Sequence, residues 1–426
     1  MKIYFSTAGD LVALLSIIAT FFYLASSLQS VFIKDTSQTL HSKNTILFCS
    51  LFIVLLHYLL AVNTLYIQEP VLNDTDNFIW WADQYARIYH NLAYSVIETE
   101  TEYYFTIGAQ LYKQYLSFFS IVLGTSSFFF SCLTISLFTV SIVYFIKICA
   151  LLNIRVLNGW IIILFGGVPG FLLITIEPYR EIYMILFLMM AIYYGLRFRL
   201  ESKILYVPLS IILLILFGLF HYAAMAMVPI IFLIVIFFPV SDHFSWRKKI
   251  PIIVFLSITF VGIIFSGIYD YIASNDQFGH VFDLFRSETI AQGRPVSGFI
   301  DKINTNIYYA RLSPGSHTYY WSLNATSFLL FIKSFLQCII YYMFKPFIWE
   351  VSSLSSLVLC LEGILRFLLI IFSIVFIFKV DHNRFRILYI LMLAIYFFVE
   401  IIWALGTSNS GTASRHHIIA QWIVIM

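Results

Sequence analysis

Residues 204 to 238 read ILYVPLSIILLILFGLFHYAAMAMVPIIFLIVIFF and contain no Asp, Glu, Lys or Arg. A helix needs about 20 apolar residues to cross a bilayer, so this run of 35 residues is either one over-long helix or two short ones. Basic side chains flank the run on both sides: Arg197, Arg199, Lys203, Arg247, Lys248 and Lys249. Because basic flanks mark the cytoplasmic side of a membrane, the chain should cross and return, with a turn near His221.

The composition extends this interpretation to the whole chain. Of the 426 residues, 61% are hydrophobic and only 11% are charged, against about a quarter in soluble proteins, and the mean hydropathy is +0.90. These values predict an all-α, polytopic transmembrane helix bundle. The net charge of +3 gives no reason to expect nucleic acid as a partner. The five cysteines fall in apolar segments without the spacing of a metal site or a disulfide framework, and we expect them to be buried.

Apolar segments of spanning length recur along the chain and predict about eleven membrane spans. They cover residues 10–33, 45–66, 126–150, 158–176, 181–199, 204–220, 222–239, 250–272, 355–378, 386–405 and 416–426. No small-residue cleavage site follows the first segment, so we expect it to remain as a helix. Basic residues lie at alternate connections, which predicts an N-terminus outside the cytoplasm. Residues 329–344 carry Lys333 and Gln337, and we expect them to lie flat in the interface.

The only long polar interval lies between residues 274 and 328. Lipid does not accommodate such a segment, so it should fold as a loop in water at the membrane surface, where loops often carry function. The sequence therefore predicts three parts. They are an N-terminal transmembrane bundle (1–272) with an acidic outer loop at 68–114, a large extracytoplasmic loop with an interfacial helix (273–354), and C-terminal transmembrane helices (355–426).

The first outer loop interleaves carboxylates with aromatic side chains in the sequence NDTDNFIWWADQYARIY, residues 73 to 89. Asp74 or Asp76 is a candidate general base for a sugar hydroxyl, and Trp81 and Tyr85 are candidate surfaces for the apolar face of a pyranose. The alternative is an interfacial helix whose aromatic residues lie at the headgroups and whose acids are solvated.

Three further residues stand out at connections expected to face outward. Arg180 directly precedes an apolar span, and its planar guanidinium suits a phosphate or pyrophosphate; the alternative is a local ion pair with Glu177 or Glu181. His221 is a candidate base or a packing residue. Arg415 is a candidate phosphate ligand. The neighbouring His416 and His417 are better interpreted as interfacial side chains that reach toward water.

Several catalytic signatures do not occur in the sequence. There is no P-loop for ATP-driven transport, no metal-ligand spacing of His, Cys and Asp, and no Gly-x-Ser-x-Gly motif. Asp74-Thr75-Asp76 has the form of a metal-binding DxD motif, but a match of three residues is weak and its expected outer location does not suit a nucleotide donor. We therefore expect neither a metal site nor a cofactor.

Four short motifs together resemble one family. They are Tyr179-Arg180-Glu181 at the start of a span, Leu219-Phe220-His221-Tyr222, Lys345-Pro346-Phe347-Ile348-Trp349-Glu350, and Ser408-Asn409-Ser410-Gly411-Thr412-Ala413-Ser414-Arg415. With the richness in Phe, Ile, Leu and Tyr, the number of spans and the large outer loop, the chain looks like the bacterial Wzy/EpsG-type polysaccharide polymerases of O-antigen and exopolysaccharide clusters. Ser410 departs from that pattern, in which an aromatic residue commonly precedes the glycine.

The resemblance implies a function outside the cytoplasmic (inner) membrane of a bacterium, facing the periplasm or the cell exterior. A growing glycan on undecaprenyl pyrophosphate would be transferred, with inversion, onto a new lipid-linked repeat unit in lipopolysaccharide or exopolysaccharide synthesis. Arg180 and Arg415 match motif positions thought to hold pyrophosphate and glycan, whereas Arg294 and Arg311 only share the large loop. No cofactor is implied, and a chain-length regulator would be a partner.

Two other functions remain open from the sequence. A GT-C-type glycosyltransferase that uses a polyprenyl-phosphate sugar would also make Asp74 or Asp76 the base, but it would add one sugar. A flippase for lipid-linked oligosaccharides belongs to a different class. The odd number of spans, the lack of a visible repeat and the one-sided loop argue against it.

Overall fold

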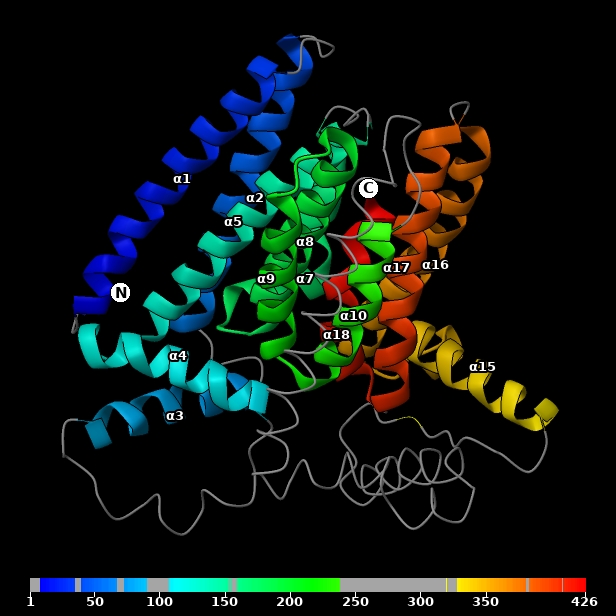
Figure 1. Ribbon diagram of the computed structural model, residues 1–426. Coiled ribbons are helices and arrows are strands. Elements are labelled where there is room, and N and C mark those ends of the chain that lie inside the picture. The colour runs from blue at the N-terminus through cyan, green and yellow to red at the C-terminus, as the bar shows by residue number, and fades with distance from the viewer. Residues whose placement is uncertain are drawn as a thin grey trace. The chain divides into compact units, whose positions relative to one another are not determined.

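The computed structural model describes residues 8–34, 40–66, 73–89, 107–152, 154, 159–237, 319, 328–380, 383–407 and 409–426. Within these ranges the chain forms helices and no β-strand, which confirms the all-α prediction. The helices are α1 (Ala8–Lys34), α2 (Leu40–Tyr66), α3 (Asn73–Tyr89), α4 (Ile107–Leu123), α5 (Ser127–Leu151), α6 (Trp160–Gly167), α7 (Pro169–Ile176), α8 (Glu181–Glu201), α9 (Tyr206–Leu219), α10 (Tyr222–Phe237), α15 (Phe328–Phe344), the 3-10 turn η1 (Ile348–Glu350), α16 (Leu354–Lys379), α17 (Asn383–Gly406) and α18 (Ser410–Ile425) (Figure 1).

Six helices of the described chain are long and apolar enough to cross a membrane. They are α1, α2, α5, α8, α16 and α17, so the chain has the transmembrane character that the composition predicts. The number eleven stays a prediction, because the expected span at 250–272 lies outside the described residues and several other helices are shorter than 18 residues. Most of the expected large loop, 273–354, also lies outside them, and the division into three parts stays a prediction.

The structure confirms that the apolar run from 204 to 238 turns at His221. Helix α9 ends at Leu219 and α10 begins at Tyr222. The His221 amide donates to Gly218 O (3.2 Å), and the His221 carbonyl accepts from Ala224 N (2.9 Å). A Cβ on Gly218 would lie 3.0 Å from the Met225 Cα, so glycine lets the two helices approach closely at the turn.

The expected span at 158–176 is interrupted. It consists of two eight-residue helices, α6 and α7, with Val168 in an extended conformation between them. Pro169 explains the interruption, because the residue before a proline is disfavoured in the α region and proline itself suits the first turn of a new helix.

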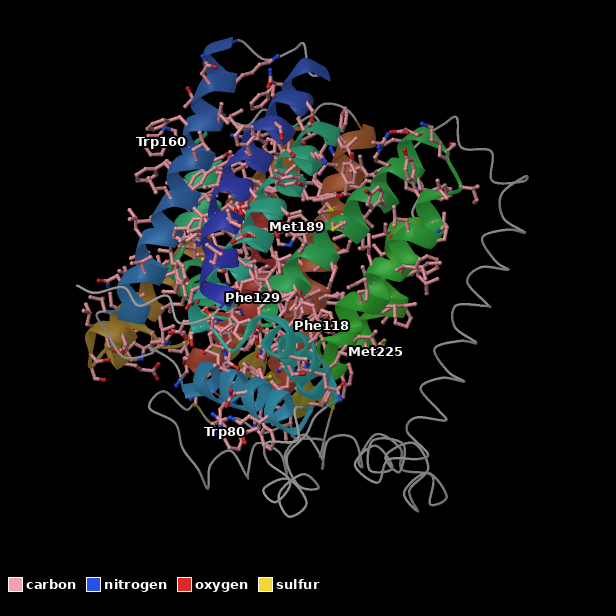
Figure 2. All side chains as sticks on the ribbon, turned by 90° about the vertical axis from the view of Figure 1, so that its left-hand side faces the viewer. Trp80, Phe118, Phe129, Trp160, Met189 and Met225 are labelled. Carbon is pink, nitrogen blue, oxygen red and sulfur yellow. The ribbon has the colours of Figure 1, made fainter. Side chains whose placement is uncertain are left out.

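The acidic outer loop at 68–114 contains helical structure. Helix α3 occupies 73–89, and α4, which we did not expect, begins at Ile107. The two helices pack together, with the Phe78 and Tyr112 rings edge to face at 5.1 Å. They lie side by side and crosswise to the long helices α5 and α8 (Figure 1). Trp80 lies on the side of α3 that is turned away from these helices (Figure 2).

The described chain divides into two compact units. The first comprises 1–238, 372–396 and 418–426, and the second comprises 239–371 and 397–417. In the first unit, α5 packs against α1, α2, α7 and α8, and Phe145 stacks on Phe165 with ring centroids 4.8 Å apart. All five cysteines are buried and free, as predicted.

Two adjacent glycines at the end of α6 provide a matched test of this packing. A Cβ on Gly166 would lie 2.3 Å from Ile53 Cγ2, whereas a Cβ on Gly167 would meet no atom within 4 Å. We expect Gly166→Ala to destabilise the protein by about 1–3 kcal/mol through overpacking and Gly167→Ala to change its stability by less than about 0.5 kcal/mol. Thermal unfolding in detergent micelles measures both. Equal melting temperatures for the two variants would contradict the packing of α6 on α2.

Candidate functional site

The sequence motif around Arg180 forms the connection from α7 to α8. Glu177 is extended and its carbonyl accepts from Tyr179 N (2.8 Å). Arg180 is the N-cap residue of α8, and its carbonyl accepts from Tyr183 N (3.1 Å). The backbone N–H groups at a helix N-terminus favour a nearby negative charge. Arg180 is therefore placed at an end of α8 where an anion would be stabilised.

The Arg180 side chain lies between the start of α8 and the end of α9. Its Nη1 donates to Phe220 O (3.5 Å), and its Nε lies 3.9 Å from Glu181 Oε1. Its side chain is 14% exposed, and that of Glu181 is buried. The ion pair proposed from the sequence as the alternative to anion binding therefore exists. Its distance exceeds the roughly 2.7–2.9 Å of a charge-assisted hydrogen bond.

Lys113, on α4, is a second cation at this site that sequence reasoning missed. It is 5% exposed, and its Nζ lies over the Trp81 ring of α3, 4.9 Å from the ring centroid. Burial, and secondly the positive charge of Arg180, lower the pKa of Lys113 to about 8. The signal in the sequence was a lone lysine within the aromatic and apolar segment LYKQYL, residues 111 to 116.

A group of aromatic side chains, which pack on one another, lies next to the two cations. We call this group, together with Lys113, Arg180, Glu181 and Trp81, the Arg180 cluster. The aromatic members are Tyr112, Tyr115, Tyr183 and Phe220. Tyr183 stacks on Phe220 at 5.2 Å. Burial raises the pKa of Tyr112 well above its usual value, so its hydroxyl is neutral. In such a low-dielectric environment, charges interact more strongly than they do in water.

The structure brings together two of the residues expected at the outer face. Arg180 and Trp81 both belong to the Arg180 cluster, and His221 follows Phe220 in the chain and is half-buried. Asp74 and Asp76 lie in the first turn of α3 and Tyr85 in its later part, but their side chains lie outside the described residues. Asp83 accepts from Arg87 Nε (2.6 Å) and from Thr125 Oγ1 (3.0 Å).

The Arg180 cluster, as defined from the described residues, does not include the other arginines expected at the site. Arg294 and Arg311 lie outside the described residues. Arg415 is half-buried on α18 and belongs to the second unit. The interpretation of His416 and His417 as side chains that reach toward water is wrong, because both are buried. His416 stacks on Trp403 at 3.9 Å, and its Nδ1 lies 3.1 Å from Thr407 Oγ1.

The second unit contains a buried group of ionisable side chains that sequence reasoning also missed. We call Arg366 (α16), Glu400 (α17) and His417 (α18) the Glu400 cluster; each is less than 5% exposed. His417 Nδ1 lies 2.5 Å from Glu400 Oε2. The available signal was the occurrence of Arg366 and Glu400 within two strongly apolar spans, since ionisable residues within spans are usually functional.

No protein-family model, curated protein or solved structure matches the chain. The chemistry of the two clusters therefore has to be inferred from their own geometry.

Titration of Lys113 tests the electrostatics of the Arg180 cluster. We expect its amine to titrate near pH 8 rather than near the ordinary value of about 10.5. Arg180→Gln should raise this pKa only in part, because burial is the larger cause. Between about pH 8 and 10.5 the unfolded chain binds more protons, so this group's contribution to folding stability rises with pH.

The measurement is ¹³C NMR of the reductively methylated protein in micelles, with Lys113→Gln used to assign the signal. Arg87→Gln is the control, because Arg87 is exposed and paired with Asp83 on α3. A Lys113 signal that titrates near 10.5 in the wild-type protein would show that the amine is solvated.

Proposed function

We propose that the chain is a membrane glycosyltransferase that polymerises glycans carried on a polyprenyl pyrophosphate, as the resemblance to the Wzy/EpsG-type polymerases implies. The observation that carries this proposal is a pair of cations, Lys113 over the Trp81 ring and Arg180 at the Phe220 carbonyl, in which the charge of Arg180 helps to lower the pKa of Lys113. Each positive charge raises the electrostatic free energy of the other, so a bound anion would stabilise both. A pyrophosphate offers several negatively charged oxygens for a planar guanidinium and a compact ammonium.

The reaction assigns a role to each of these charges. An acceptor hydroxyl attacks the anomeric carbon, the bond from that carbon to the pyrophosphate oxygen breaks, and the electron pair stays on the pyrophosphate. Arg180 and Lys113 stabilise the negative charge that develops on this leaving group. Trp81, over whose ring the Lys113 Nζ lies, would contact the sugar.

The proton of the acceptor hydroxyl must pass to a base. Among the three candidates, His221 has the strongest support, because it adjoins Phe220, whose carbonyl accepts from Arg180 Nη1. Asp74 and Asp76 remain candidates at the start of α3, the helix that carries Trp81. Arg415, Arg294 and Arg311 remain predictions from the resemblance and the loop sequence. The proposed location is the outer face of a bacterial cytoplasmic membrane.

A specific observation favours the flippase as a second candidate function. The Glu400 cluster places three ionisable side chains inside a helical unit, as is common along the proton pathways of transporters. A GT-C-type transferase acting on a polyprenyl monophosphate would use the Arg180 cluster in the same way as a polymerase. It differs in adding a single sugar.

The glycan ladder of a host cell that lacks the gene distinguishes these functions. The intact gene should restore a long ladder. Arg180→Gln and Lys113→Gln should each lower the rate of chain extension about 10-fold or more, since each removes a charged hydrogen bond to the leaving group. The matched control, Arg87→Gln, should leave the ladder unchanged because Arg87 is exposed on α3.

Each other outcome has a distinct meaning when the membrane level of every variant is confirmed by immunoblot. A full-length ladder in both Arg180→Gln and Lys113→Gln would refute the role of these cations. An unchanged ladder with one sugar missing from each unit would identify a GT-C-type transferase. Repeat units trapped on the cytoplasmic side would identify a flippase.

A further inference from the structure

The C-terminal end of α15 lacks two of the amide donors that would normally follow it. The carbonyl of Tyr342 would accept from residue 346, but residue 346 is proline and has no N–H. The carbonyl of Met343 would accept from Phe347 N, which instead donates to Glu350 Oε2 (2.9 Å). These two carbonyls therefore require other donors, because buried backbone groups are costly without a partner.

Two side chains of the Glu400 cluster supply these donors. Arg366 Nη1 donates to Met343 O (2.5 Å), and His417 Nε2 lies 3.0 Å from Tyr342 O. The backbone of α16 approaches the same end, since a Cβ on Gly363 would lie 3.2 Å from Phe344 O. Cationic donors also suit the negative end of a helix dipole. Helices α16, α17 and α18 thus hold the end of α15 through one group of charges.

The contact with Tyr342 fixes the protonation of His417. A carbonyl oxygen can only accept, so Nε2 must carry a hydrogen. Nδ1 faces Glu400 Oε2 at 2.5 Å, and this contact is a hydrogen bond only if one proton lies between the two atoms. The proton resides either on Glu400, with both groups neutral, or on His417, with the groups oppositely charged. In both cases the pair binds one proton and has no net charge.

Loss of this proton would change the contact. The pair would become Glu400 carboxylate and neutral His417, with the lone pair of Nδ1 facing a negative oxygen, and the proton would pass to water. Arg366, which interacts electrostatically with both groups, would stabilise the carboxylate. His417 would be pushed away from Glu400, and its hydrogen bond to Tyr342 O would weaken.

Other titratable or charged groups of the second unit are also placed near the pair. Glu362 of α16 accepts from Ser414 Oγ (2.9 Å), and Tyr342 of α15 interacts with Glu400 and packs on the His417 ring at 4.2 Å. Arg415 and His416 precede His417 on α18, and His416 is held by Thr407. None of these contacts replaces the proton between His417 Nδ1 and Glu400 Oε2.

We propose that Glu400 and His417 form a buried proton-binding site whose bound proton holds the end of α15, and with it the segment Lys345–Glu350, against α16, α17 and α18. The ligand is a single proton exchanged with water. The segment that it controls is ordered by Glu350, which accepts from Lys345 Nζ (2.6 Å) and Phe347 N. It exposes Trp349, 78% accessible, which stacks on Phe347.

Infrared spectroscopy of the full chain in lipid nanodiscs tests the proton directly. As pH rises from about 6 to 10, a range that covers ordinary histidine titration and beyond, we expect a carboxyl or imidazolium band to disappear from the wild-type spectrum. Glu400→Gln should lack this change at every pH, because its amide donates permanently to Nδ1. Glu362→Gln is the matched control and should retain the change, since Glu362 accepts from a serine hydroxyl.

Labelling of Cys338 tests the structural consequence in a variant whose other four cysteines are serine. Cys338 lies one turn before Tyr342, and its Sγ donates to Ala404 O (3.3 Å). At high pH we expect the wild-type background to react about 10-fold faster or more than Glu400→Gln, and the two to react equally at low pH. Comparison at the same pH cancels the thiol's own titration.

Two results would overturn the proposal. One is a wild-type infrared spectrum that changes with pH as Glu400→Gln does. The other is a labelling ratio that stays at one throughout the pH range. If Glu400→Gln does not fold, His417→Gln takes its place, because it keeps a donor toward Tyr342 O but removes Nδ1. A titration unchanged by His417→Gln would equally contradict a shared proton.

Discussion

A backbone polar group within a bilayer must find its partner inside the protein, and the ends and interruptions of helices are where this requirement is hardest to meet. Several carbonyls at such positions have side-chain partners, and three of them serve as examples. His57 Nε2 lies 2.9 Å from Gly166 O before the interruption at Pro169, Arg180 Nη1 donates to Phe220 O after α9, and His417 Nε2 reaches Tyr342 O before Pro346. Each of these three donors is a titratable or cationic side chain. Ionisable side chains are therefore found where these helices end or are interrupted.

The two clusters differ in how their charges are balanced. In the Glu400 cluster, Arg366 and His417 make contacts of 2.5 to 3.0 Å with fixed carbonyls and with Glu400. Breaking such a buried network leaves charges without partners, which is strongly destabilising. In the Arg180 cluster, the ion pair is 3.9 Å long and the contact with Phe220 is 3.5 Å long. Both of these Arg180 contacts are longer than the contacts within the Glu400 cluster.

The sequence predicted those parts of the fold that follow from hydrophobic length and basic flanks. It placed the turn at His221 between α9 and α10, because charges on both sides of the run required a return. It missed α4, since a 17-residue helix that carries Lys113 falls short of a span in both length and composition. Pro169 was visible, but a continuous apolar pattern on both sides of it suggested one span where the structure has two short helices.

The candidate site was predictable at Arg180, a charge directly before an apolar span, and at Trp81, an aromatic residue among carboxylates in the first outer loop. It was not predictable at Arg366, Glu400 and His417. These residues lie up to 51 positions apart in the sequence and form a cluster only because three helices pack together. Tyr342 shows why. Its carbonyl lacks a donor because of Pro346, a local feature of the sequence, yet the residue that supplies the donor lies on α18. A local rule therefore identifies the need for a partner, and only the packing of helices identifies the partner.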